Sequence, residues 1–154
     1  MKKEINYENF KNQILNILEK NKIWVLSTSF NNEVSSRNMS IVNDDLTLFF
    51  QTNECYIKEF QMRNNPNVSL CYSNISIEGI AEPIGNWKDE KNKKLLELYK
   101  KHHLNSFEYY GFLEGQVVYK ISPKLIKVWK YSDKKPFREI AYIKEKKVYE
   151  MDFM

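Results

Sequence analysis

The sequence has few of the residues that mark metal centres or disulfide frameworks. Only two cysteines occur in 154 residues, Cys55 and Cys71, and they are too far apart for a Cys-x-x-Cys pair. This spacing predicts neither a zinc site nor a thioredoxin-like couple, and we expect two reduced, half-buried thiols. The two histidines, His102 and His103, are adjacent and would point about 100° apart on a helix, so they cannot chelate one metal ion from one face. We therefore expect no metal site.

Long apolar runs and blocks of one charge are also missing. Nowhere do about 18 apolar residues follow one another, and the charged N-terminus precedes no apolar run, so neither a membrane span nor a targeting segment is expected. The net charge of +4 comes from lysines and glutamates that are mixed along the chain. Such a mild field argues against a nucleic-acid partner. We expect a cytoplasmic protein that binds neither membranes nor nucleic acids.

The composition that remains is globular and rich in aromatic residues. Hydrophobic residues make up 42% of the chain, charged residues 29%, and Phe, Trp and Tyr together 14%. A chain of this length can bury a sizeable core by itself, and the aromatic content favours strands. We expect a single domain over residues 1–154.

The spacing of apolar residues predicts a helix and then mainly strands. An amphipathic helix is expected over about 7–20. Three strands joined by short turns follow, and then a short helix that begins at Asn53 and ends at Asn64-Asn65-Pro66. The remaining expected elements are two strands in NVSLCYSN and ISIEGIAEP, a helix in KDEKNKKLLELYKK, an aromatic connection in NSFEYYGF, and two strands hinged at Ser122-Pro123 in GQVVYKISPKLIKVWKYS.

This order of elements favours a barrel over a sandwich. At least six strands, mostly sequential neighbours, are interrupted by three helices, and closure of the sheet would remove its exposed edges. We expect a mainly β protein with flanking helices (α+β), built on a six-stranded antiparallel β-barrel over about 23–132. An extended tail is expected over about 136–153.

The segment FFQTNECYIKEF, where a strand leads into a helix, carries the residue types of an anion site. With Asn53 as N-cap, the amides of residues 54–56 would point outward beside the Thr52 hydroxyl, and Lys58 would lie one turn further on. Arg37 lies in the strand that pairs with this one, so its guanidinium can converge on the same anion. Two simpler interpretations stay open, namely that Asn53 only caps the helix while Lys58 is solvated, and that Arg37 pairs with a carboxylate on a solvent face.

Four segments in order add a more specific signal. They are RNMSIV, LFFQTNECYIKEFQMRNNPNVSLCY, ISIEGIAEP and IKVWKY, and the most specific features are Thr52-Asn53, the lysine six positions after Thr52 and the Asn-Pro-x-Val-Ser-Leu continuation. Together they resemble the pyridoxamine 5'-phosphate oxidase-like, FMN-binding split-barrel flavoproteins over about 23–138. The resemblance implies a split barrel that binds FMN and acts as an oxidoreductase, in which the flavin carries the electrons and no side chain needs to act as acid or base.

The resemblance also implies which residues contact FMN. Arg37, Thr52 and Lys58 would bind the phosphate, the backbone from residue 38 to 42 would follow the flavin edge, and the later residues would come from a partner subunit. A homodimer with the cofactor at its interface is thus implied, acting on a small redox substrate or taking electrons from a nicotinamide donor. The full set of implied cofactor-binding residues is Arg37, Asn38, Met39, Ser40, Thr52, Asn53, Lys58, Asn74, Trp129 and Arg138.

Departures from the family pattern limit what is implied about the substrate. Ile57 stands where members often have a basic residue before the lysine, so one phosphate contact is missing. Val42 stands where true pyridoxamine phosphate oxidases have a lysine, and the stretch after Trp129 lacks their Arg-x-His pattern. The usual vitamin substrate site is therefore not recognisable.

Two other readings of the function remain open. A small β-barrel that binds single-stranded nucleic acid would use Tyr109, Tyr110 and Phe112 as stacking platforms, although core or interface packing accounts for them as well. A split barrel that binds haem or a deazaflavin coenzyme is the other. No convergent carboxylate pair and no nucleophile elbow supports hydrolytic chemistry.

Overall fold

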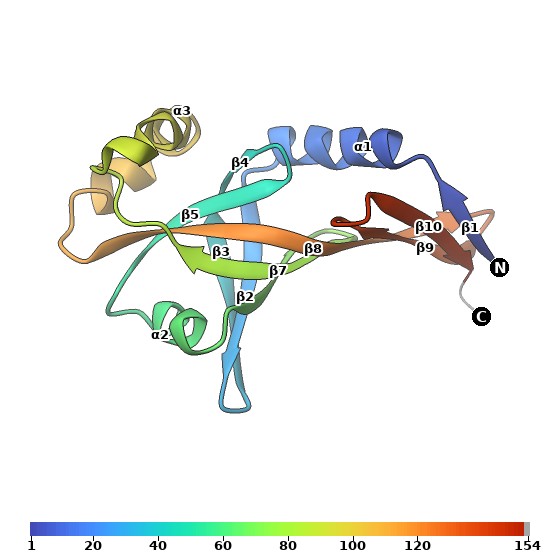
Figure 1. Ribbon diagram of the computed structural model, residues 1–154, viewed down its shortest axis with the longest axis horizontal. Helices are drawn as coiled ribbons and strands as arrows, with labels where there is room; N and C mark the ends of the chain where they lie inside the picture. The colour runs from blue at the N-terminus through green and yellow to red at the C-terminus, as the bar shows by residue number, and fades with distance from the viewer. Residues whose placement is uncertain (153–154) are drawn as a thin grey trace.

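The computed structural model describes residues 1–152, which form one antiparallel sheet with three α-helices packed on it (Figure 1). Residue 153, at the end of the expected tail, lies outside the described residues. The helices are α1 (Tyr7–Lys20), α2 (Ile57–Asn64) and α3 (Lys93–Tyr110), and a 3-10 turn η1 (Glu90–Asn92) precedes α3. The strands are β1 (Lys2–Ile5), β2 (Ile23–Phe30), β3 (Glu33–Ser40), β4 (Val42–Asp44), β5 (Thr47–Asn53), β6 (Asn67–Tyr72), β7 (Ile75–Pro83), β8 (Gln116–Ser132), β9 (Lys135–Tyr142) and β10 (Lys147–Asp152).

Strand β8 organises the sheet because it pairs with three other strands. It pairs with β7 along most of its length, with β5 over its first part and with β9 over its second part. The strands β3, β2, β6, β7, β8, β5 and β4 curve into the barrel, while β9, β10 and β1 continue as a wing that extends away from it in Figure 1. Within residues 1–152 no hydrogen-bonded ladder joins β3 to β5, so the sheet is open there.

The prediction of six strands is wrong, since the described residues form a ten-stranded sheet. The antiparallel barrel itself is confirmed as an open, split sheet, and the expected extended tail is part of a paired wing. In the wing, β9 and β10 form a hairpin, and β1 at the N-terminus pairs with β10 in the register Lys2↔Met151. Pairing between the two chain ends is a long-range event that the polar sequence of β1 does not signal.

The prediction of two separate strands hinged at Ser122-Pro123 is also wrong, because β8 runs through this point as one strand. The strand is nevertheless irregular there, since Glu78 and Gly79 of β7 pair with Leu125 and Pro123, which leaves Lys124 of β8 without a partner in this ladder. A Cβ atom on Gly79 would lie 2.7 Å from the carbonyl oxygen of Ser122, so only glycine allows the two backbones to approach this closely.

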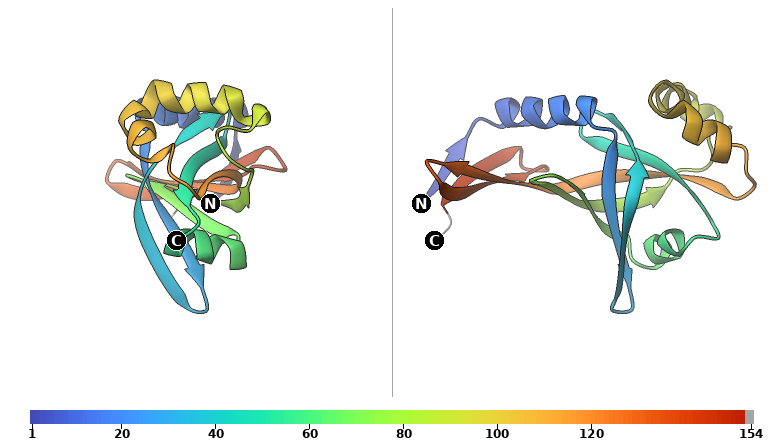
Figure 2. Two further views of the ribbon diagram at one scale, coloured as in Figure 1. Left: turned by 90° about the vertical axis from the view of Figure 1, so that its left-hand side faces the viewer. Right: turned by 180° about the vertical axis from the view of Figure 1, so that it is seen from behind.

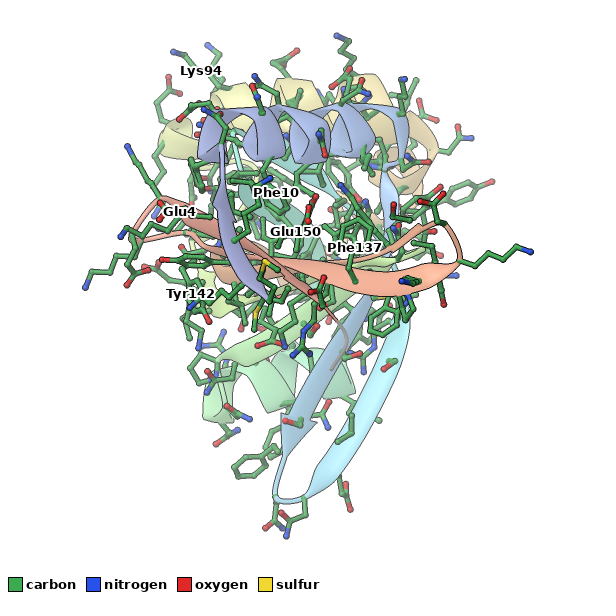
Figure 3. The ribbon with its side chains drawn as sticks, turned by 90° about the vertical axis from the view of Figure 1, so that its right-hand side faces the viewer. Glu4, Phe10, Lys94, Phe137, Tyr142 and Glu150 are labelled. Atoms are coloured by element: carbon green, nitrogen blue, oxygen red, sulfur yellow. The ribbon has the colours of Figure 1, made fainter. Side chains whose placement is uncertain are left out.

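Helix α1 begins and ends at the predicted residues. Its N-cap is Asn6, whose side-chain oxygen accepts a hydrogen bond from the amide of Asn9 at 2.8 Å. The apolar face of α1 buries Phe10, Ile14 and Leu18. Figure 3 shows Phe10 on the side of α1 that faces the C-terminal strands. The helix thus covers the passage from barrel to wing.

Helix α3 is longer than predicted and kinked. It continues to Tyr110, through the segment expected to be an aromatic connection, and His103 has non-helical dihedral angles (φ −136°, ψ 45°). The Nε2 atom of His103 lies 2.7 Å from the carbonyl oxygen of Ile41, which fixes the kink to the β3–β4 connection. The pKa of His103 is lowered, mainly by burial.

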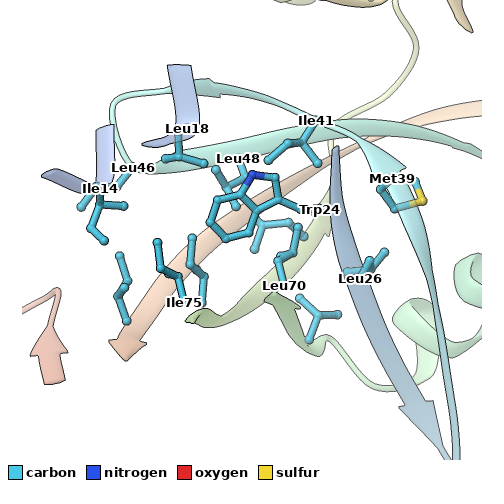
Figure 4. Close-up of a cluster of buried hydrophobic side chains, with 14 of the residues drawn as sticks. Ile14, Leu18, Trp24, Leu26, Met39, Ile41, Leu46, Leu48, Leu70 and Ile75 are labelled. Atoms are coloured by element: carbon cyan, nitrogen blue, oxygen red, sulfur yellow. The ribbon is translucent and has the colours of Figure 1, made fainter. Parts of the chain in front are cut away.

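The main hydrophobic core fills the barrel below α1, and Trp24 lies at its centre (Figure 4). Trp24 is 1% exposed and donates from Nε1 to the carbonyl oxygen of Asn21 at 2.9 Å. A smaller cluster under α3 contains Trp87, Tyr99 and Phe107. Because Leu26 and Met39 belong to the main core, the strands that carry the expected site residues are held by buried apolar contacts.

The β2–β3 hairpin projects beyond the barrel, and α2 lies beside it on the side opposite to α1 and α3 (Figures 1 and 2). Glu59 anchors α2, since it is 3% exposed, accepts a hydrogen bond from the Tyr119 hydroxyl at 3.2 Å and pairs with Arg63. Burial, followed by the charge of Glu59, raises the pKa of Tyr119 to about 12. Among residues 1–152, no helix has both the length and the apolar composition needed to cross a bilayer.

Candidate functional site

A cavity of about 310 Å³ lies where β3, β5, α2 and α3 meet. Its volume falls within the range of small-molecule sites, which hold a ligand of the size of a cofactor. The cavity combines residues from the expected site with others from α3. It is lined by Asn38, Met39, Ser40, Gln51, Thr52, Tyr56, Lys58, Tyr99, Ser106, Tyr110 and Gln116.

Thr52 lines this cavity and carries a buried hydroxyl without a partner among residues 1–152. Its side chain is 3% exposed, and Oγ1 has no hydrogen-bond partner among the described residues. A buried polar atom without a partner carries an energetic cost, and such atoms are rare unless a water or a ligand satisfies them. Thr52 therefore has the character of a ligand contact.

Arg37 and Lys58 are two cations without an acidic partner in the part of the chain that the structure describes. None of the ion pairs found within residues 1–152 includes either residue. The Nζ atom of Lys58 instead lies 4.5 Å from the centre of the Tyr56 ring. Burial lowers the pKa of Lys58, and the nearby charge of Arg37 lowers it further. The charge of Arg37 thus acts on Lys58, and no carboxylate among residues 1–152 pairs with either cation, which suits an anion.

Arg37 does not line the cavity itself and is held by neutral oxygen atoms. It donates from Nη1 to the Thr28 hydroxyl at 2.7 Å and from Nη2 to the Ser35 hydroxyl. Burial lowers the pKa of Arg37. The interpretation that Arg37 pairs with a carboxylate is therefore wrong, while its convergence with Lys58 on one anion stays a prediction.

The predicted cup of amides at residues 54–56 is wrong. Helix α2 begins only at Ile57, its N-cap is Tyr56, and no side chain caps it. The amides of residues 54, 55 and 56 are all used internally, by the carbonyl oxygen of Gly115 (2.9 Å), Asn53 Oδ1 (3.0 Å) and the carbonyl oxygen of Asn53 (3.0 Å). Asn53 forms a turn of its own before the helix, since its side chain bonds the backbone two residues on. The amides of the first helical turn start at Ile57.

Helix α3 contributes polar side chains to the cavity that the sequence analysis does not predict. The Tyr99 hydroxyl lies 3.0 Å from Ser106 Oγ, and Gln51 donates from Nε2 to the carbonyl oxygen of Ser106 at 3.5 Å while its Oε1 accepts from Trp87 Nε1 at 2.8 Å. Burial raises the pKa of Tyr99. Tyr99 and Ser106 are seven residues apart, two helical turns, and this spacing becomes a signal only once α3 is known to extend past residue 104.

The aromatic cluster at the end of α3 is mostly outside the cavity. Tyr109 is 77% exposed and Phe112 is 67% exposed, whereas Tyr110 lines the cavity. Core packing is therefore wrong for Tyr109 and Phe112, while interface packing stays a prediction; the ring of Phe112 meets the buried ring of Phe107 edge to face (4.9 Å between ring centres). Of the three residues, Tyr110 alone contributes to the candidate site.

Asn74, Trp129 and Arg138 lie together in a second hollow of about 320 Å³, apart from the first cavity. Asn74 Nδ2 donates to the carbonyl oxygen of Trp129 at 2.6 Å, the Trp129 amide donates back to Asn74 at 2.9 Å, and Trp129 faces Arg138 in the β8–β9 register. One chain therefore brings these three residues to each other but not to Lys58. Cys71 also borders this hollow, and both cysteines are exposed rather than half-buried as expected.

Comparison with solved structures decides the fold family. No family model and no curated protein sequence matches the chain. A protein from Listeria innocua assigned as a pyridoxamine 5'-phosphate oxidase is 24% identical, with a TM-score of 0.61 over 77% of this chain and 97% of that chain. The chain has the split-barrel fold of the pyridoxamine 5'-phosphate oxidase-like proteins. The resemblance inferred from the sequence is thus confirmed.

Other solved structures share the split barrel but differ in what they bind. A FAD-binding protein from Mesorhizobium loti is 11% identical, with a TM-score of 0.61 over 99% of both chains. The haem storage protein HutZ from Vibrio cholerae is 11% identical, with a TM-score of 0.63 over 73% of this chain and 88% of that chain. At these identities the likeness establishes the fold alone, and the ligand has to be argued from the residues of this split barrel.

The lowered pKa of Lys58 predicts how anion binding at this site would depend on alkaline pH. Since burial and Arg37 favour the neutral amine, Lys58 loses its charge at a lower pH than an ordinary lysine, and an anion loses one partner as pH rises through that pKa. We expect the affinity for FMN to fall as the pH rises through the lowered pKa of Lys58, measured by flavin fluorescence at increasing alkaline pH. Lys58→Arg, which stays charged, is expected to remove the fall. Riboflavin controls for ionisation of the flavin ring. An equal fall in FMN affinity in the wild type and in Lys58→Arg would contradict the role of Lys58 as a phosphate contact.

The same charges predict a gain of stability when the lysine is removed. Lys58→Met relieves the burial of one charge and its repulsion with Arg37, so the apoprotein is expected to be stabilised by up to about 1 kcal/mol in urea unfolding. Lys94→Met, at an exposed position of α3 (Figure 3), is the matched control and is expected to change nothing. A destabilised Lys58→Met protein would show that the lysine has a structural role instead.

Proposed function

We propose that this split barrel is an FMN-dependent oxidoreductase that binds the FMN phosphate at Arg37, Lys58 and Thr52. One observation carries the proposal: Lys58 lines the same cavity as Thr52, whose buried hydroxyl has no partner, and neither Lys58 nor Arg37, whose charge acts on Lys58, has a carboxylate partner in the described chain. A phosphate monoester dianion supplies two negative charges and several acceptor oxygens, which is what this combination lacks. An uncharged ligand would leave both cations uncompensated.

The rest of the cavity suits the flavin ring. FMN, when bound, supplies hydride and electron transfer. The chain contributes the wall of β3, where Asn38 and Ser40 offer polar groups along one edge and Met39 an apolar contact. Gln51 and Tyr99 form the polar side of the cavity under α3. These residues bind and orient the cofactor and limit access of water, and none of them is required as a proton carrier.

We further propose a cytoplasmic homodimer with the cofactor at its interface. A second copy would bring the hollow of Asn74, Trp129 and Arg138 to the cavity, where the resemblance implies these residues act. Exposed apolar side chains on the hairpin and α2 support an interface: Phe30 is 36%, Val34 72%, Ile57 70% and Phe60 55% exposed. Apolar surface of this kind is typical of an interaction site. The exposed, unpaired thiols suit a reducing compartment.

The pyridoxamine phosphate substrate is not part of the proposal. Val42 occupies the position of the oxidase lysine and is fully buried in the cluster under α3, so no cation can act from there. We propose a small redox substrate or a nicotinamide donor instead.

Titration of the purified apoprotein with FMN, riboflavin and haem tests the proposed function. We expect a yellow holoprotein with a flavin spectrum, tight binding of FMN and much weaker binding of riboflavin, followed by flavin reduction with NADH or NADPH. A haem Soret band without flavin binding would favour the haem-binding alternative, and a colourless protein that shifts oligonucleotides on gels would favour the nucleic-acid alternative. Either result would reject FMN.

A further inference from the structure

Arg37 is joined to α2 by a set of buried hydrogen bonds that the ligand does not need to touch. Its two terminal nitrogens donate to the hydroxyls of Thr28 and Ser35. Both hydroxyls in turn donate to Gln61 Oε1, at 2.6 Å from Thr28 and 2.7 Å from Ser35. The side-chain oxygen of Gln61 in α2 therefore accepts hydrogen bonds from both hydroxyls to which Arg37 donates.

The direction of every hydrogen bond in this set is determined by the chemistry of its ends. A guanidinium can only donate, and an amide oxygen can only accept. Each hydroxyl has a single proton, which must point to Gln61, so its lone pairs are left facing Arg37. The side-chain nitrogen of Gln61 donates to the carbonyl oxygen of Glu33 at 3.3 Å, which fixes the amide in this orientation. Gln61 is thus the group that turns both hydroxyls into acceptors for Arg37.

This arrangement holds the arginine without neutralising it. Arginines in strands are commonly fixed by carboxylates, which would cancel the charge that an anion needs. Here all acceptors are neutral, and Thr28 and Gln61 are 1% and 4% exposed, so water competes little with them. Arg37 keeps its full charge and has a defined position.

We propose that Gln61 is a positioning residue that sets the guanidinium of Arg37, through Thr28 and Ser35, before any phosphate binds. The inference rests on the proposed function only for its effect on FMN, because the positioning of Arg37 exists in the apoprotein. Lys58 and Gln61 are three residues apart in α2 and so lie on one helical face. The same helix therefore supplies one phosphate cation and positions the other.

A second contact keeps α2 in register with the hairpin. Asn65, at the end of α2, donates from Nδ2 to the carbonyl oxygen of Ser29 at 3.0 Å and to its hydroxyl at 3.1 Å. The rings of Phe30 and Phe60 meet edge to face at 5.6 Å. These contacts do not involve Gln61, so its replacement is expected to leave the helix in place while freeing Arg37.

NMR of the arginine side chains in the apoprotein tests the positioning directly. In the wild type we expect the Arg37 guanidinium resonances to be resolved and slow to rotate. In Gln61→Leu, and in Thr28→Val, they are expected to average, whereas Thr28→Ser keeps the hydroxyl and is expected to keep them resolved. Ser36→Ala is the matched control, since it removes a hydroxyl pair (Ser27 to Ser36, 2.8 Å) on the other face of the same hairpin. Unchanged Arg37 resonances in both Gln61→Leu and Thr28→Val would overturn the inference.

Binding of FMN and riboflavin gives the functional readout. We expect Gln61→Leu to weaken FMN about tenfold and riboflavin hardly at all. In the Arg37→Ala background Gln61→Leu is expected to have no further effect, because Gln61 acts through Arg37. Equal tenfold losses in both backgrounds would overturn the inference. A wild type that binds no FMN but shows the fixed Arg37 would reject the proposed function and leave the positioning role intact.

Discussion

Replacement of Arg37 or Lys58 by alanine is expected to weaken FMN binding by about 1–3 kcal/mol in each case, and to change riboflavin binding little. Each cation would make a charge-assisted contact with the phosphate, which riboflavin lacks. Because the two charges are close enough to affect one another, the double variant is expected to bind FMN and riboflavin almost alike. Fluorescence titration with both flavins at one salt concentration measures the difference.

A matched control separates the phosphate site from the general charge of the protein. Lys94→Ala removes one positive charge from an exposed position and is expected to change neither affinity by more than the error. If Arg37→Ala and Lys58→Ala weakened FMN and riboflavin equally, the two residues would act on the ring or on the fold and not on the phosphate.

Replacement of Trp24 by alanine is expected to destabilise the protein by about 3–5 kcal/mol, the largest effect on stability that we predict. Trp24 is 1% exposed at the centre of the main core (Figure 4). Its replacement leaves a cavity and removes the hydrogen bond from its indole nitrogen to the carbonyl oxygen of Asn21. Urea unfolding followed by circular dichroism measures the change. Trp24→Phe is expected to cost clearly less, and a loss below about 1 kcal/mol for alanine would show that the core repacks.

The effect of Trp24 reaches the candidate site through the strands. Trp24 and Met39 are opposite each other in the β2–β3 register, and Leu26 is opposite Arg37. A looser core beneath this ladder is expected to reduce FMN binding as well as stability. The core and the phosphate site are therefore energetically linked through one hairpin.

The barrel was predictable because its signals are local. Alternation with period two marks most barrel strands, and α1 combines a helical apolar face with a capping Asn6. The wing was not predictable in the same way, since β1 is polar and forms only by pairing with β10 at the other end of the chain. Helix α3 was cut short because the kink at His103 interrupts its pattern.

The candidate site was predictable for residues within contiguous motifs and not for residues that meet only in space. Thr52 and Lys58 follow each other closely, and the structure brings both to one cavity. The prediction that Asn53 caps the helix is wrong, because an asparagine side chain that can cap a helix can also form a turn of its own. Gln61 lies 33 residues from Thr28 along the chain, so no local pattern reveals that they act on one arginine.

Phosphorus NMR of bound FMN tests the phosphate site most directly. The second pKa of a free phosphate ester is about 6, and contact with Arg37 and Lys58 favours the dianion and lowers that pKa. The phosphorus shift of bound FMN is therefore expected to stay constant from pH 7.5 to about pH 5, while that of free FMN titrates. A bound phosphate that titrates like the free ester would contradict the placement of the phosphate between these two cations.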